Sequence, residues 1–249
     1  MTTSVEAPIE RHETALKFLH NTQVSIEKAR IAVGNRVKAI ERGVDGGQVP
    51  MPETYTSILG ALEAVEAEID AAIKDELTRW PVWDLWLRHV RGIGPSLAGQ
   101  MLALLLPPRA DKGPSSWFKA AGLAPELRPD GMMRLPRARA GEGKITYHPW
   151  LRRCLHNVAH SFVLMGGYYR QVYEQKKAAL VAKHTGDADW PPHRLDSVAR
   201  WSMLKVFLGH TWEAWCEADG IPNRGPYIVA LHPEHHYIPR PLPDGKAKI

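Results

Sequence analysis

A short glycine-containing segment between two apolar stretches constrains this chain most. Gly92 and Gly94 flank Ile93, and Pro95 stands at a position that favours the first residue of a helix. Apolar residues at helical spacing precede the segment (Trp83, Trp86, Leu87 and Val90) and follow it (Ala98, Met101, Leu102, Leu105 and Leu106). The pattern predicts two short helices joined by a glycine turn, a helix-hairpin-helix.

Such a turn can bind a phosphate group. Glycine has no Cβ, so its backbone can approach an anion, and the first amides of the second helix favour negative charge. Arg91 has a positive charge and Ser96 a hydroxyl beside the turn. The alternative to a phosphate-binding turn is a plain helical hairpin in which the glycines only form the turn. We expect DNA contacts from Arg91, Gly92, Ile93, Gly94, Pro95 and Ser96.

Positive charge is concentrated in the part of the chain that contains this turn. The formal net charge is +5, but residues 1–80 have 9 Lys and Arg against 13 Asp and Glu, whereas residues 81–249 have 23 against 14. Residues 127–153 are the most basic stretch, and their glycines and Pro136 predict an irregular loop or a ribbon. We expect phosphate contacts from Arg128, Arg134, Arg137, Arg139, Lys144, Arg152 and Arg153, the alternative being a solvated basic loop.

The periodicity along the rest of the chain predicts a mainly α fold in three parts. Residues 9–42 and 53–80 read as two long helices, the first with a heptad seam interrupted by Gln23 and Arg30, and predict an antiparallel coiled-coil arm over 1–80. We expect the arm to form a homodimer, the alternative being an arm that closes on itself within one chain. Residues 81–219 are expected to form a helical domain with further helices over 150–161, 168–183 and 195–218. Residues 220–249 predict an extended tail rich in Pro and His.

Cysteine, histidine and apolar residues set further expectations. Cys154 and Cys216 lie in apolar helical contexts and predict no disulfide. No signal-peptide core or membrane span is evident, so a cytoplasmic protein is expected. Two groups of residues are candidate metal ligands: His156 with His160, which are four residues apart, and the tail residues His232, Glu234, His235 and His236. We expect neither a metal nor another cofactor.

Three segments occur in an order that is similar to one known family. They are Arg91-Gly92-Ile93-Gly94-Pro95 with Ala98, Ala121-Gly122-Leu123-Ala124-Pro125, and Lys144-Ile145-Thr146 followed by Leu151-Arg152-Arg153. Over about residues 81–165 the chain resembles the C-terminal transposase domain of the IS-one-ten insertion-sequence family, the bridge-RNA-guided recombinases. The preceding arm looks like the coiled coil of that family. The resemblance implies a helical DNA-binding domain of transposase origin.

Two departures from the family limit the chemistry that the resemblance implies. Family members resemble a fusion to a DEDD nuclease-like domain, whose acidic metal-binding quartet has no counterpart before this arm. They also have a nucleophilic serine after the Ala-Gly-Leu segment, where this chain has Leu127-Arg128-Pro129-Asp130-Gly131. Strand cleavage therefore lacks its nucleophile and metal ligands, and Thr146 or Tyr147 is the alternative nucleophile.

The sequence thus predicts a DNA-binding protein that acts in transposition or recombination and contacts the phosphate backbone with weak sequence preference. Three alternatives stay open. One is an active transposase or recombinase completed by a partner with the DEDD domain. The second is a structured-RNA-binding protein, and the third is a coiled-coil adaptor.

Overall fold

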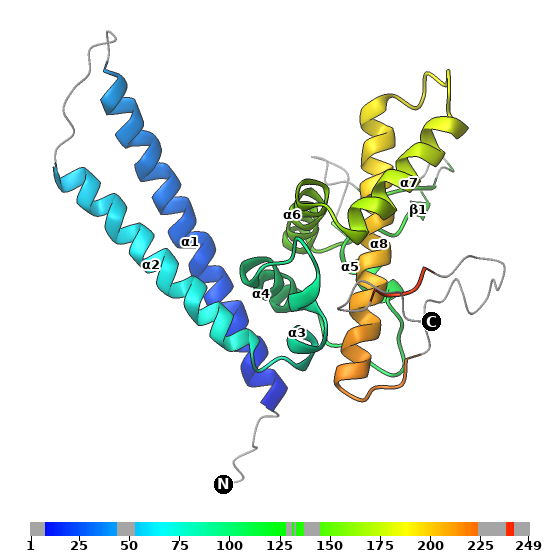
Figure 1. The fold of residues 1–249 in the computed structure, drawn as a ribbon, viewed down its shortest axis with the longest axis horizontal. Helices are drawn as coiled ribbons and strands as arrows, with labels where there is room; N and C mark the ends of the chain where they lie inside the picture. The colour runs from blue at the N-terminus through cyan, green and yellow to red at the C-terminus, as the bar shows by residue number, and fades with distance from the viewer. Residues whose placement is uncertain are drawn as a thin grey trace. The chain divides into compact units, whose positions relative to one another are not determined.

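The computed structural model describes residues 8–43, 53–127, 131, 133–136, 145–223 and 238–241, with side chains from residue 14 onward. These residues form α-helices, one short 3-10 helix and a single two-stranded sheet, which confirms the mainly α fold (Figure 1). The chain divides into two compact units, residues 1–79 and residues 80–249.

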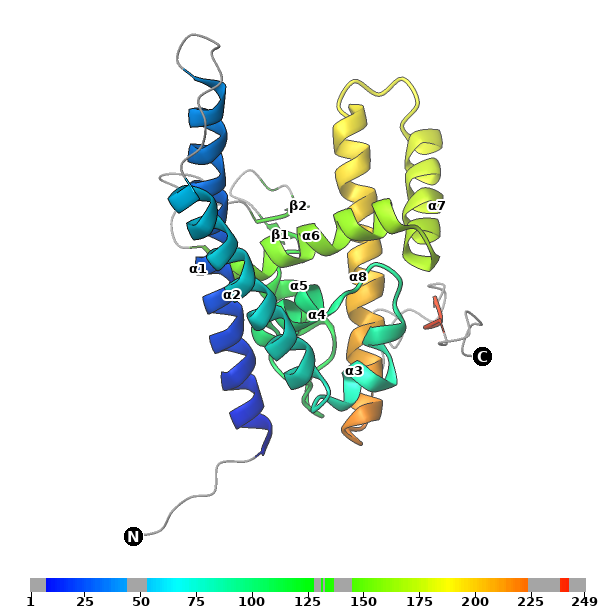
Figure 2. The ribbon, with the colours of Figure 1, turned by 60° about the vertical axis from the view of Figure 1, so that its left-hand side comes forward.

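The first unit is a pair of long antiparallel helices, α1 (Pro8–Arg42) and α2 (Glu53–Leu77), as Figure 2 shows. The two polar residues that interrupt the predicted seam find partners on α2. Gln23 Nε2 donates to Asp70 Oδ1 at 2.6 Å, and Arg30 forms an ion pair with Glu66. The arm therefore closes on itself within one chain.

Helix α2 ends three residues before the predicted boundary at Trp80. The amides of Thr78 and Arg79 bond to the carbonyls of Asp75 and Glu76, three residues back, so the last turn tightens. Trp80 is extended, with φ −104° and ψ 105°. The cause is Pro81, because its ring disfavours the helical conformation of the residue before it.

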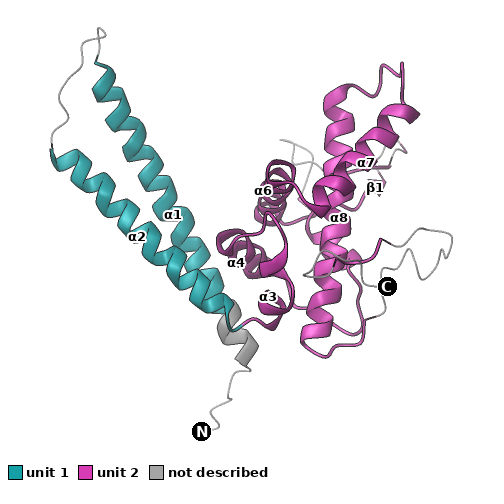
Figure 3. Ribbon diagram, in the orientation of Figure 1, with its two compact units in different colours: residues 1–79 teal, residues 80–249 magenta. Residues whose placement is uncertain are grey.

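The second unit is built around α8 (Pro192–Ala218), which contacts α3, α5, α6 and α7 (Figure 3). The outer elements are α3 (Pro81–Leu85), η1 (Leu87–His89), α4 (Pro95–Leu104), α5 (Ser115–Ala120), α6 (Pro149–Met165) and α7 (Tyr168–Lys183). Aromatic rings form much of the core against α8. The ring of Phe207 lies 4.9 Å from Phe162, and the ring of Trp212 lies 4.8 Å from Trp117.

The stretch before the glycine turn differs from the predicted single helix. It is two short pieces, α3 and η1, separated by Trp86 with φ −148°. The ring of Trp86 is buried, with its centroid 5.8 Å from that of Phe207, so packing on α8 sets this conformation rather than local helix preference. Leu106 was predicted to face inward but is 70% exposed, because α4 ends at Leu104, ahead of the two prolines at 107 and 108.

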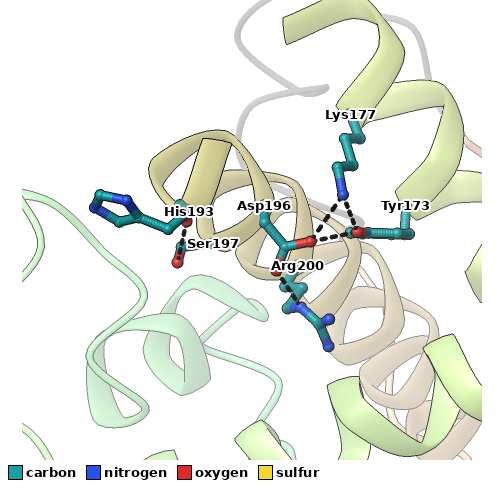
Figure 4. Close-up of polar contacts among 6 residues, drawn as sticks. All are labelled: Tyr173, Lys177, His193, Asp196, Ser197 and Arg200. Atoms are coloured by element: carbon teal, nitrogen blue, oxygen red, sulfur yellow. Dashed lines mark hydrogen bonds and ion pairs between the residues drawn. The ribbon is translucent and has the colours of Figure 1, made fainter. Parts of the chain in front are cut away.

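A polar cluster joins α7 to α8 near the start of α8 (Figure 4). The carboxylate of Asp196 accepts hydrogen bonds from Tyr173, from Lys177 Nζ at 3.1 Å and from Arg200 Nε at 2.6 Å. Burial alone would raise the pKa of Asp196, but the bonds from Tyr173, Arg200 and Lys177 outweigh it and hold the pKa at about 2. The cluster is satisfied within itself and fastens the two helices together.

The described part of the predicted tail, residues 238–241, packs on the helices. Tyr168 donates its hydroxyl to the carbonyl of Pro239 at 2.9 Å, and His210 Nε2 lies 2.8 Å from the carbonyl oxygen of Ile238. Arg240 is only 4% exposed and pairs with Glu217 at 2.5 Å. This part of the tail therefore belongs to the core of the unit, which its proline content did not indicate.

Both cysteines are buried free thiols. Burial raises the pKa of Cys154 to about 12 and that of Cys216 to about 11, so neither is a reactive thiolate near neutral pH. In the part of the chain that the structure describes, no helix has the length and apolar character required to cross a bilayer.

Candidate nucleic-acid interface

The predicted glycine turn forms a tight elbow between η1 and α4, and its two glycines have different roles. Gly92 has φ +96°, in the left-handed region that favours glycine. A Cβ at Gly92 would lie 3.0 Å from Phe162 Cδ1 and 3.3 Å from Ser161 Oγ, both on α6. Ser161 Oγ also donates to the carbonyl of Gly92 at 2.6 Å. Gly92 therefore holds the elbow against α6 and is a packing residue.

Gly94 is the residue of the elbow that faces open space. It is exposed, has an ordinary φ of −94° and ψ of 172°, and a Cβ there would meet nothing within 4 Å. It is the N-cap of α4, followed by Pro95 at the first helical position. On one side of Gly94, Ile93 is buried, and on the other side Ser96 is exposed. Gly94 is thus the point at which the backbone can approach an anion.

Arg91 is held beside the elbow by a second contact. A Cβ at Gly167, where φ is +92°, would lie 3.2 Å from Arg91 Cδ and 3.3 Å from its Cβ. The aliphatic stem of Arg91 therefore lies against the junction of α6 and α7, while the residue as a whole is exposed. This arrangement leaves the guanidinium group at the surface.

Arg152 and Arg153, which are adjacent near the start of α6, lie in different environments. Arg152 lies between two rings, with its Cζ 4.8 Å from the centroid of Tyr147 and 5.5 Å from that of Trp201. Its Nη1 donates to the carbonyl of Pro136 at 2.5 Å. Arg152 thus anchors the segment before α6 to the body of the unit, whereas Arg153 is exposed.

The rest of the predicted basic stretch is described in part. Residues 126–134 include a small ribbon in which β1 (Glu126–Leu127) pairs antiparallel with β2 (Met133–Arg134), and Arg134 is exposed opposite Glu126. A ribbon was one of the two predicted forms. Four of the predicted phosphate contacts lie outside the described residues: Arg128, Arg137, Arg139 and Lys144.

The alternative nucleophiles have contacts that distinguish them. Thr146 Oγ1 donates to Glu126 Oε1 at 2.7 Å, so one exposed hydroxyl has a carboxylate beside it. Tyr147 packs closely over Gly122, where a Cβ would lie 2.8 Å from the ring. Thr146 therefore has the geometry of a hydroxyl next to a base, and Tyr147 has a packing role.

The metal candidates do not gather further ligands where they are described. His156 and His160 are exposed on α6, and within the described residues no group of three or more His, Cys, Asp or Glu side chains is placed to hold a metal ion. The tail candidates His232, Glu234, His235 and His236 lie outside the described residues.

The structure also places residues that the sequence analysis did not single out. Ser161 contacts Gly92 of the elbow, and Gly167 contacts Arg91 beside it. Both are far from the elbow in sequence, so no local pattern identifies them. Asn157 is exposed on the same face of α6 as Arg153. The helical periodicity of α6 could have indicated this face.

Comparison with protein-family models and with curated proteins found no match for this chain.

Proposed function

We propose that this protein binds duplex DNA in a transposition or recombination process, contacting the phosphate backbone through the elbow at Gly94 and through Arg91 beside it. The supporting observation is that the two glycines of the elbow have different surroundings: Gly92 packs against α6, whereas Gly94 is exposed at the start of α4. An exposed glycine at a helix N-terminus lets a phosphate approach the backbone and the positive end of the helix dipole. Arg91 supplies charge beside it, and the resemblance to the IS-one-ten transposase domain favours DNA.

The proposal predicts that Gly94→Glu weakens binding to a duplex of about 30 base pairs by roughly tenfold or more, because a carboxylate would stand where a phosphate binds. Gly94→Gln is the control matched in size but without the charge, and it should weaken binding less than Gly94→Glu. Fluorescence anisotropy over a salt titration measures both variants, and thermal unfolding confirms that both remain folded. Equal affinity of Gly94→Glu and the unchanged protein would exclude the elbow as the contact.

The same assay separates the alternatives. Stronger binding to a structured RNA than to duplex DNA at one salt concentration would favour the RNA-binding alternative. Nicked product from supercoiled DNA, lost in Thr146→Val, would favour strand cleavage by this chain.

We propose further that the arm forms a homodimer through its open flank. On α2, Ile58 is 46% and Val65 is 40% exposed, and Ala61 and Ala72 continue this stripe at helical spacing. Helix α1 has seven Lys and Arg against four Asp and Glu, whereas α2 has one against seven. Two copies related by a two-fold axis can therefore place the acidic α2 of each against the basic α1 of the other.

The double substitution Ile58→Glu with Val65→Glu is expected to convert the dimer to a monomer, since it places charge in the apolar contact. Light scattering coupled to size-exclusion chromatography measures the mass. Ala67→Glu, which adds one acid on an exposed position away from the stripe, should leave the dimer intact. A monomer in the unchanged protein would contradict the proposal.

A further inference from the structure

Helix α6 presents one face to solvent that the elbow contact does not use. Its buried residues lie on one side (Leu151, Cys154, Leu155, Val158, Ala159 and Phe162). The opposite side exposes residues at spacings of three and four: Trp150, Arg153, His156, Asn157, His160 and Leu164. None of the 17 residues of α6 is acidic, so nothing on the helix opposes the charge of Arg153.

We infer that this face of α6 enters the major groove of duplex DNA and reads base edges. The inference rests on the proposed DNA binding and adds sequence recognition to it. The major groove admits an α-helix, an arginine can bond to both O6 and N7 of guanine, and an asparagine can bond to both N6 and N7 of adenine. Arg153 and Asn157 stand one helical turn, about 6 Å, apart on the exposed face, which is close to two base-pair steps.

The position of the elbow relative to α6 supports this assignment. Ser161, which fastens Gly92, directly follows His160 of the exposed face, so the elbow lies at the edge of that face. A helix in the major groove has phosphates along its edges, so the Gly94 backbone would meet the phosphate strand while α6 meets the bases. The hydrogen bond from Ser161 Oγ to the Gly92 carbonyl holds the elbow at this edge of α6.

The shape of the major groove favours DNA over double-stranded RNA as the partner of this helix face. The major groove of A-form RNA is too deep and narrow for side chains to read, whereas that of B-form DNA is open. Arg153 to His160 spans about 10 Å along the helix, which corresponds to about three base-pair steps. The recognised site should therefore contain a guanine and an adenine within about four consecutive base pairs.

The test is a selection of bound duplexes from a randomised library by the full chain, followed by affinity measurements on the selected duplex and on a scrambled one. Asn157→Ala and Arg153→Lys should each reduce the preference for the selected duplex by roughly 5- to 150-fold. Affinity for the scrambled duplex should change little, since Arg153→Lys keeps the charge that the phosphates attract. Gln175→Ala, at an exposed position of α7, is the control and should keep the full preference.

The outcomes separate this inference from the proposed function. Duplex binding that depends on Gly94 but shows no sequence preference, or a preference that survives both α6 substitutions, would overturn the α6 inference alone. Absence of duplex binding by the unchanged protein would overturn both. A selected motif that loses its guanine in Arg153→Lys and its adenine in Asn157→Ala would support the assignment residue by residue.

Discussion

Replacing Gly92 by alanine should lower the free energy of unfolding of the second unit by roughly 2–4 kcal/mol. Two effects add. The φ of +96° is strained for any residue with a Cβ, and the new methyl group would lie 3.0 Å from Cδ1 of the fully buried Phe162. Denaturant unfolding followed by circular dichroism measures the change.

Gly94→Ala is the matched control for this experiment. Its backbone is in an extended conformation open to all residues, and no atom lies within 4 Å of the position that the methyl group would take. We expect a change in unfolding free energy of about 0.5 kcal/mol or less. If the two substitutions destabilised the protein equally, the elbow would not be anchored at Gly92.

The second large effect is a loss of stability in mild acid that depends on His210. Its imidazole is buried, with Nε2 2.8 Å from the carbonyl oxygen of Ile238 and Nδ1 2.9 Å from the hydroxyl of Tyr169. Because a carbonyl only accepts, Nε2 bears the proton and Nδ1 accepts from Tyr169. Burial is the largest cause that lowers the pKa of His210, nearby Arg240 also lowers it, and the bond to Ile238 opposes them; together they hold the pKa at about 4.

The pH dependence follows from the difference between the folded and unfolded pKa values. His210 titrates near 6.5 in the unfolded chain and near 4 in the folded one, so only the unfolded state takes up the proton between these values. The stabilisation is complete above pH 6.5 and falls by up to about 3 kcal/mol as the pH drops to 4. Urea unfolding at a series of pH values measures this slope.

His210→Gln isolates the contribution of the imidazole from those of the other histidines. Glutamine cannot take up a proton, so the variant should lose less stability between pH 6.5 and 4 than the unchanged protein. Identical slopes for the two proteins would show that His210 does not account for the acid sensitivity.

Much of this fold could be predicted because its information is local. The helical periodicity of residues 9–42, 150–161 and 168–183 predicted α1, α6 and α7, since the spacing of apolar residues on one helix is set by that helix alone. Trp86 shows the limit of such reasoning. Its apolar spacing fitted a helix, but its ring packs on Phe207, more than a hundred residues away, and the backbone breaks there.

The candidate site divides in the same way. The sequence by itself determined that a glycine turn precedes α4 and that several arginines lie in the stretch that leads into α6, because turn preference and charge depend on only a few neighbouring residues. Only the tertiary structure decided which glycine packs and which is open, and that Arg152 is half-buried and bonded to Pro136 while Arg153 is exposed. The physical reason is that burial depends on contacts with Pro136, Ser161 and Trp201, which reach these residues only when distant elements pack together.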